Sequence, residues 1–147
     1  MPAVTMESLR IAIYEQTIRA GTPPRVAELS RLLDRPTTEI RESLQRLADA
    51  HVIVLQQDSG EILMAAPWSA VPTAFLVKAG SYRAHGNCIW DALGILAALH
   101  VDGEIETSCA DCGAVLPVRV RSEAVEGDGL IHFALPVREW WNDIVFT

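Results

Sequence analysis

Two proline-containing breaks divide the first fifty residues into three short segments with helical periodicity. Apolar residues recur at three-and-four spacing over residues 6–19, and Gly21-Thr22-Pro23-Pro24 ends that pattern. A second amphipathic run covers residues 26–33 and ends at Asp34-Arg35-Pro36, before a third run begins. The sequence therefore predicts three helices packed into about the first fifty residues.

A β-hairpin is predicted directly after the third helix. Thr37 or Thr38 is placed to cap that helix. The apolar run Val52–Leu55, a polar turn at residues 57–60 and the run Ile62–Met64 then have the pattern of two paired strands. Three helices followed by a hairpin predict a winged-helix-like module over residues 1–64.

The pattern changes after this module, and we predict an α+β fold for the whole chain. Residues 65–73, with two prolines and no clear periodicity, are expected to form an extended linker to a domain over residues 74–147. Asn87 is placed to cap a central helix that runs to about Leu99. A small mixed sheet is expected around this helix, with strands at residues 75–77, 101–107, 115–120, 130–135 and 144–146.

The charge distribution disfavours nucleic acid as a partner. The net charge is -7. Residues 1–57 carry seven Arg and seven Asp or Glu, so the whole excess of acid lies in the second part. DNA binders draw affinity from Lys and Arg that neutralise phosphates, and Arg41 and Arg46 in the third helix are offset by neighbouring acids. No apolar run approaches the ~20 residues of a membrane span, so we expect a cytoplasmic protein with no membrane partner.

The first candidate site is the pair Cys88 and Asp91. If Asn87 caps the helix, Cys88 lies in its first turn, where free amide groups and the helix dipole stabilise a thiolate. Asp91 lies three residues later on the same face, within an apolar stripe where a carboxyl group tends to keep its proton. A thiolate beside such a carboxyl suits attack on a soft electrophile followed by proton delivery. A buried, inert cysteine and a solvated aspartate are the alternative interpretation.

The second candidate is the motif Cys109-Ala110-Asp111-Cys112-Gly113. C-x-x-C followed by glycine is half of a structural zinc site or a redox pair, but a closed zinc site needs four ligands. His85 or His132 could add ligands, although no second C-x-x-C is present. We therefore expect no bound cofactor, and the alternative is a turn between two strands whose thiols face inward.

Four blocks of this sequence, in this order, resemble the alkylmercury (organomercurial) lyases. The resemblance runs over nearly the whole chain. The residues that show it are Pro67-Trp68-Ser69-Ala70-Val71-Pro72-Thr73, Asn87-Cys88-Ile89-Trp90-Asp91-Ala92-Leu93-Gly94, Ser108-Cys109-Ala110-Asp111-Cys112-Gly113, and His132-Phe133 followed by Trp140-Trp141-Asn142-Asp143-Ile144-Val145-Phe146-Thr147.

The resemblance implies an enzyme that cleaves carbon–mercury bonds by protonolysis, releasing a hydrocarbon and leaving mercury on protein thiols. It implies that Cys88 is the catalytic cysteine that binds mercury and that Asp91 carries the proton. Cys109 resembles a family cysteine regarded as structural, and Cys112 is found in a subset of relatives. Small cellular thiols or a mercuric reductase are the implied acceptors of the mercury. Thiolate is the best protein ligand for so soft a metal.

The sequence departs from the family pattern at its end. Relatives place a second catalytic cysteine shortly after the segment that resembles residues 140–147, whereas this sequence ends at Thr147. Three explanations are open: a truncated gene, a degenerate relative that only binds metal, or a stop codon read as selenocysteine. The alternative function is a non-catalytic metal-binding protein or winged-helix regulator that uses Cys109 and Cys112.

Overall fold

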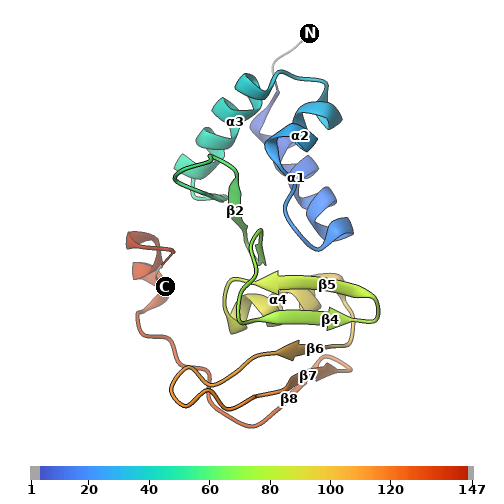
Figure 1. The fold of residues 1–147 in the computed structure, drawn as a ribbon, viewed down its shortest axis with the longest axis vertical. Coiled ribbons are helices and arrows are strands. Elements are labelled where there is room, and N and C mark those ends of the chain that lie inside the picture. The colour runs from blue at the N-terminus through green and yellow to red at the C-terminus, as the bar shows by residue number, and fades with distance from the viewer. Residues whose placement is uncertain (1–3, 146–147) are drawn as a thin grey trace.

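The N-terminal part consists of three helices and a hairpin, in the predicted order (Figure 1). A computed structural model describes residues 4–145. Its first elements are α1 (Met6–Ala20), α2 (Val26–Leu33), α3 (Thr37–Asp49), β1 (Val54–Leu55) and β2 (Ile62–Ala65). The antiparallel pairing of Val54 with Met64 confirms the hairpin. The prediction that the module is a winged helix stays a prediction.

The helix starts differ in how they are capped. Thr5 caps α1 by accepting a hydrogen bond from the backbone amide of Ser8 at 3.0 Å. The predicted threonine cap of α3 is wrong: Pro36 has the extended backbone of the N-cap, so Thr37 is already the first helical residue. None of the helices in the described part of the chain has the length and apolar character that crossing a bilayer requires.

One antiparallel sheet runs through both parts of the molecule. The predicted linker contains β3 (Trp68–Ser69), which pairs with β2 on one side and with β5 (Tyr82–Gly86) on the other. The sheet continues through β4 (Leu76–Ala79), β6 (Gly103–Glu106), β7 (Val118–Arg121) and β8 (Ala124–Glu126), in the order β1-β2-β3-β5-β4-β6-β7-β8. The α+β class is confirmed, but the expectation of a small mixed sheet is wrong, because the strands form one eight-stranded sheet that is antiparallel in every described pairing. The division into domains stays a prediction.

The remaining corrections concern the C-terminal third. Residues 130–135, predicted as a strand, have no regular structure, because this exposed segment pairs with no strand in the described part of the chain. A short 3-10 helix, η1 (Val137–Asn142), precedes residues 144 and 145, which form a turn and not the predicted strand. Phe146 and Thr147 lie outside the described residues. The strands β5 and β8 were not predicted.

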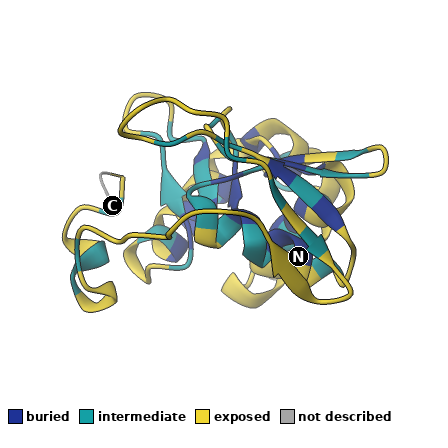
Figure 2. Cartoon of the chain, turned by 90° about the horizontal axis from the view of Figure 1, so that it is seen from below, coloured by how far each residue is buried: buried dark blue, intermediate teal, exposed yellow. Residues whose placement is uncertain are grey.

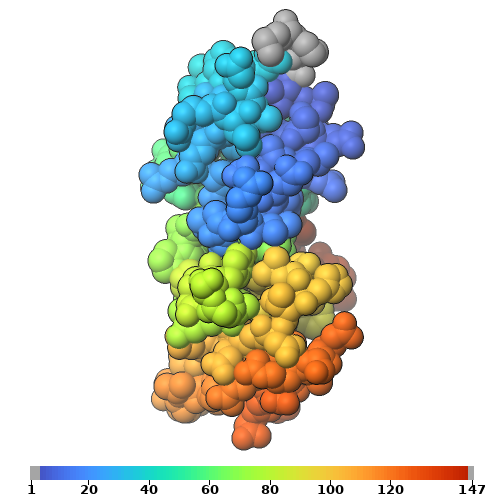
Figure 3. Space-filling view, turned by 90° about the vertical axis from the view of Figure 1, so that its right-hand side faces the viewer, coloured from blue at the N-terminus to red at the C-terminus, as the bar shows by residue number. Residues whose placement is uncertain are grey.

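Two hydrophobic cores meet at Tyr14 of α1. The first lies among α1, α2, α3 and the hairpin, and the second between the sheet and α4 (Ile89–Leu99). Tyr14 packs against both cores, stands edge-on to the buried Trp68 at 6.3 Å between ring centres, and donates a hydrogen bond to the carbonyl of Ala66 at 3.1 Å. Figure 3 shows the N-terminal helices (blue) stacked directly on the second part. The two parts are therefore held as neighbours by packing as well as by β3.

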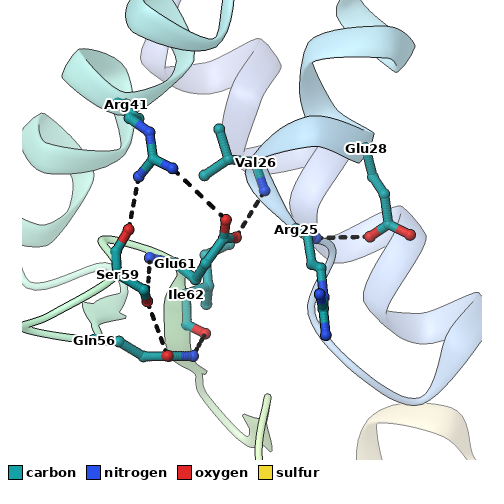
Figure 4. Close-up of polar contacts among 8 residues, drawn as sticks. All are labelled: Arg25, Val26, Glu28, Arg41, Gln56, Ser59, Glu61 and Ile62. Carbon is teal, nitrogen blue, oxygen red and sulfur yellow. Dashed lines mark hydrogen bonds and ion pairs between the residues drawn. The ribbon is translucent and has the colours of Figure 1, made fainter.

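A polar network fixes the hairpin to the helices (Figure 4). Arg41 of α3 donates to the carbonyl of Ser59 at 2.8 Å and lies 3.9 Å from the Glu61 carboxylate. Glu61 also accepts from the backbone amide of Val26, the first residue of α2, at 2.8 Å. A helix start carries unpaired amides that a carboxylate satisfies well. Glu61 thus joins three elements, and Arg41 is engaged within the fold.

Gly86 allows the end of β5 to lie against the start of α4. A Cβ atom at this position would lie 2.5 Å from the backbone nitrogen of Ala92 and 2.8 Å from its Cα. We expect Gly86→Ala to lower the free energy of unfolding by about 1–3 kcal/mol, measured by urea denaturation, because backbone must move.

Gly94→Ala is the matched control within α4. Its added methyl group would meet only the Pro67 side chain at 3.5 Å. Alanine is favoured over glycine inside a helix by up to ~1 kcal/mol, so this variant is expected to be neutral or more stable. Equal losses in the two variants would show that close backbone approach is not what Gly86 provides.

Candidate active site

Cys88 is the N-cap of α4, one position earlier in the helix than predicted. Its backbone is extended (φ -147°, ψ -178°), and its sulfur accepts a hydrogen bond from the amide of Asp91 at 3.5 Å. The prediction that Asn87 is the cap is wrong, because the Asn87 side chain is engaged elsewhere: its Nδ2 donates to Asp91 Oδ2 at 2.8 Å. The thiol is thus held at the N-terminal end of α4.

The structure places Asp91 beside Cys88, as the spacing predicts. Asp91 lies in the first turn of α4 and is half-buried. Its backbone amide donates a hydrogen bond to the Cys88 sulfur, and its carboxylate accepts one from the Asn87 side chain. Behind it, Ala92 and Ile95 are fully buried in the second core. The carboxyl group therefore lies at the edge of the apolar face of α4.

Burial keeps the Cys88 thiol protonated more than the helix position suggests. The pKa of Cys88 is raised above its ordinary value, because burial disfavours the charged thiolate. The amides of Asp91 and Trp90 act in the opposite direction, and the negative charge of Asp91 raises the pKa further. The expectation that the helix start makes Cys88 a ready thiolate is therefore wrong, because desolvation outweighs the amide contacts.

The pKa of Asp91 is raised as well, as the sequence predicts. Burial is the largest cause, and hydrogen bonds from the side chain and the backbone amide of Asn87 work against it by stabilising the ionised carboxylate. Two groups that each resist ionisation therefore lie side by side. A proton held by one of the two groups can therefore pass to the other.

Both side chains face a cavity of about 220 Å³ between the two parts of the molecule. One wall is formed by the start of α4 and another by the turn after α3 with the hairpin; the third comes from the C-terminal segment. Apolar and aromatic side chains predominate. The lining residues are His51, Val52, Ile53, Val54, Met64, Ala66, Asn87, Cys88, Asp91, Phe133, Trp140, Trp141, Ile144 and Val145.

The C-terminal segment reaches this cavity through stacked rings. Trp141 lies flat on His51, with ring centres 4.2 Å apart and planes 5° from parallel. Phe133 lies between Trp90 and Trp140, at 6.2 Å and 5.3 Å. Much of the C-terminal segment is exposed (Figure 2). Sequence analysis missed this wall, although the aromatic residues of the C-terminal segment were visible, because it did not pair them with residues some ninety positions earlier.

Cys109 and Cys112 lie outside this cavity, in the connection between β6 and β7. The turn is closed by a hydrogen bond of 2.9 Å from the amide of Gly113 to the carbonyl of Cys109. Cys109 is half-buried and Cys112 is exposed, so the expectation of inward-facing thiols is wrong for Cys112. The pKa of Cys109 is lowered by amides of Cys112 and Asp111 and by the Cys112 thiol. Within residues 4–145, no three His, Cys, Asp or Glu side chains gather as metal ligands, so neither His85 nor His132 joins the pair.

The raised pKa of Asp91 predicts how stability depends on pH. Between its unfolded and folded pKa, Asp91 is protonated more in the folded chain than in the unfolded chain, so its contribution to the free energy of unfolding falls as pH rises through that window. Asp91→Asn removes this ionisation. We expect its Tm to exceed that of the wild type at pH 7, and the difference to shrink below about pH 4. A difference in Tm between the two proteins that stays constant or grows as pH falls would contradict this sign.

Comparison with known proteins finds a matching family and a similar solved structure. The sequence model of the alkylmercury lyase family matches residues 68–147. A solved structure described as the mercury-bound form of MerB2 is similar to this chain, with a TM-score of 0.61 and 25% identity. That match covers 86% of this chain, so it extends into the N-terminal part, and 60% of the other chain. The chain thus spans less than two thirds of that relative's length. No curated protein matches the sequence.

Proposed function

The chain belongs to the alkylmercury lyase family, and we propose that it cleaves carbon–mercury bonds by protonolysis at Cys88 and Asp91. One observation carries this proposal: a thiol and a carboxyl group with raised pKa values face the same largely apolar cavity. An organomercurial has a soft metal that thiolate binds and a carbon that must receive a proton. The cavity offers both reactants together.

The first proposed step is capture of the organomercurial. The Cys88 sulfur forms a bond to mercury, the ligand opposite the organic group leaves, and the thiol proton passes to the ionised Asp91 carboxylate. Because the pKa of Cys88 is raised, the thiol needs such a base. Capture thus leaves Asp91 protonated, and the next step uses this proton.

The second proposed step is cleavage. Asp91 delivers its proton to the carbon bound to mercury, the carbon–mercury bond breaks, and its electron pair forms the new carbon–hydrogen bond. The hydrocarbon leaves and Hg(II) remains on the Cys88 sulfur. Small thiols then take the mercury away by ligand exchange. The apolar walls suit the organic group.

Hydrocarbon release tests this proposal. The chain is incubated with phenylmercury and an excess of a small thiol, and benzene is measured by gas chromatography against a protein-free control. We expect benzene to form only with the protein. Mercury binding without benzene would reject catalysis by this chain.

The regulator alternative has less support. The arginines of α3 that would face DNA are engaged within the fold, since Arg41 holds the hairpin and Arg46 donates to Ser43 at 2.8 Å. Metal binding by Cys109 and Cys112 stays a prediction, and the proposed reaction does not use these residues.

A further inference from the structure

We propose that Asn87 is a positioning residue that determines which oxygen of Asp91 carries the transferred proton. This inference rests on the proposed function, because it concerns the acid of that reaction. Its basis is the direct contact of Asn87 Nδ2 with Asp91 Oδ2 at 2.8 Å in the wall of the cavity.

The orientation of the Asn87 amide is fixed by its surroundings. Nδ2 also lies 3.4 Å from the carbonyl of Pro67, so it faces two acceptors at once. Turning the amide over would place Oδ1 against both of those acceptors, which is unfavourable. The present orientation is retained even though the buried Oδ1 has no partner among residues 4–145. Leaving such an atom unpaired carries a free-energy cost, so the Nδ2 contacts outweigh it.

A fixed donor makes the two carboxyl oxygens unequal. In a protonated carboxyl group the carbonyl oxygen is a better acceptor than the hydroxyl oxygen. The Asn87 side chain donates to Oδ2, and this contact favours Oδ2 as the carbonyl oxygen and Oδ1 as the oxygen that carries the proton. The same contact limits rotation of the carboxyl group. Proton delivery therefore starts from one defined oxygen in one orientation, which lowers the entropy cost of the transfer.

The role of Asn87 separates the two steps of the reaction. Capture of mercury depends on the Cys88 sulfur, whereas cleavage depends on the direction of the proton. Asn87→Leu replaces the amide by an apolar group of similar size. We expect capture of phenylmercury, followed by stopped-flow thiolate–mercury absorbance, to stay within about twofold of wild type, while single-turnover benzene release falls by about tenfold or more.

Thr73→Val provides a matched control. Thr73 donates to the carbonyl of Gly86 at 2.6 Å, beside the start of α4, and does not line the cavity. This variant also loses a hydrogen bond next to the site, so we expect a lower Tm with an unchanged ratio of capture to release. If Asn87→Leu fails to fold, Asn87→Ala is measured in the same way. Equal slowing of both steps, or unchanged release, would overturn the proposal.

A second measurement separates this proposal from the lyase activity itself. The side-chain amide resonances of Asn87 are assigned by NMR in the wild type and in Asp91→Ala, without substrate. Loss of the acceptor should shift these resonances and speed their exchange with solvent. If the wild type releases no hydrocarbon but these shifts occur, the proposed function fails and the contact stands. Unchanged resonances would show that Asn87 does not hold Asp91.

Discussion

Cys88→Ser is expected to reduce single-turnover hydrocarbon release to the protein-free rate, a loss of about 10³-fold or more. The sulfur at the N-cap of α4 is a thiol in the cavity wall. A serine hydroxyl at the same place is a hard, neutral group that binds mercury poorly. Rapid-quench assays with one equivalent of phenylmercury measure the loss. The two thiols of the β6–β7 turn also bind mercury, so capture is followed by absorbance with Cys109 and Cys112 both replaced by serine. In that background, Cys88→Ser should abolish capture together with release.

The control for this variant is Cys112→Ser, the same chemical change on the exposed turn outside the cavity. We expect it to keep both capture and release. The opposite pattern, in which Cys112→Ser inactivates the chain and Cys88→Ser does not, would place the chemistry on the β6–β7 turn and remove the basis of the proposed site.

Asp91→Asn is expected to separate the two steps. The variant keeps the shape of the side chain but has no proton to deliver, so benzene release should fall by about 10²–10⁴-fold. Mercury should still bind to Cys88, although more slowly below the pKa of the thiol, because the carboxylate that accepts the thiol proton is absent. Mass spectrometry would detect the organomercurial still attached to the protein.

Two results would count against this role of Asp91. Wild-type release in Asp91→Asn would mean that solvent or another group supplies the proton. Loss of capture alone, with normal release from whatever is captured, would assign Asp91 to activation of the thiol and not to cleavage. The Tm of the variant, expected above that of the wild type at pH 7, shows that any loss is not caused by unfolding.

Local periodicity was enough to predict the helices and the central pair. The breaks at residues 21–24 and 34–36 mark the ends of α1 and α2, and the spacing of Cys88 and Asp91 predicts their shared face. These features depend on neighbours within four positions in the sequence. The same kind of pattern fails for residues 130–135, whose apolar composition suggests a strand but which find no pairing partner within the described chain.

The rest of the site depends on contacts between distant residues. Cys88 and not Asn87 caps α4, because the Asn87 side chain contacts Asp91. The pKa of Cys88 is raised because the thiol is partly buried. The stacking of Trp141 on His51 joins segments ninety positions apart. Propensity and spacing describe one segment at a time, so they do not predict which aromatic residues of the C-terminal segment enclose the thiol.

The most direct test of the account measures carbon–mercury cleavage and mercury retention in the same samples. The wild-type chain is mixed with one equivalent of phenylmercury, quenched over time, and analysed for benzene and for protein-bound Hg(II). We expect benzene and Hg(II) bound to Cys88 to appear together, in equal amounts and after capture. Protein that holds phenylmercury with the carbon–mercury bond intact, and never releases benzene, would contradict it.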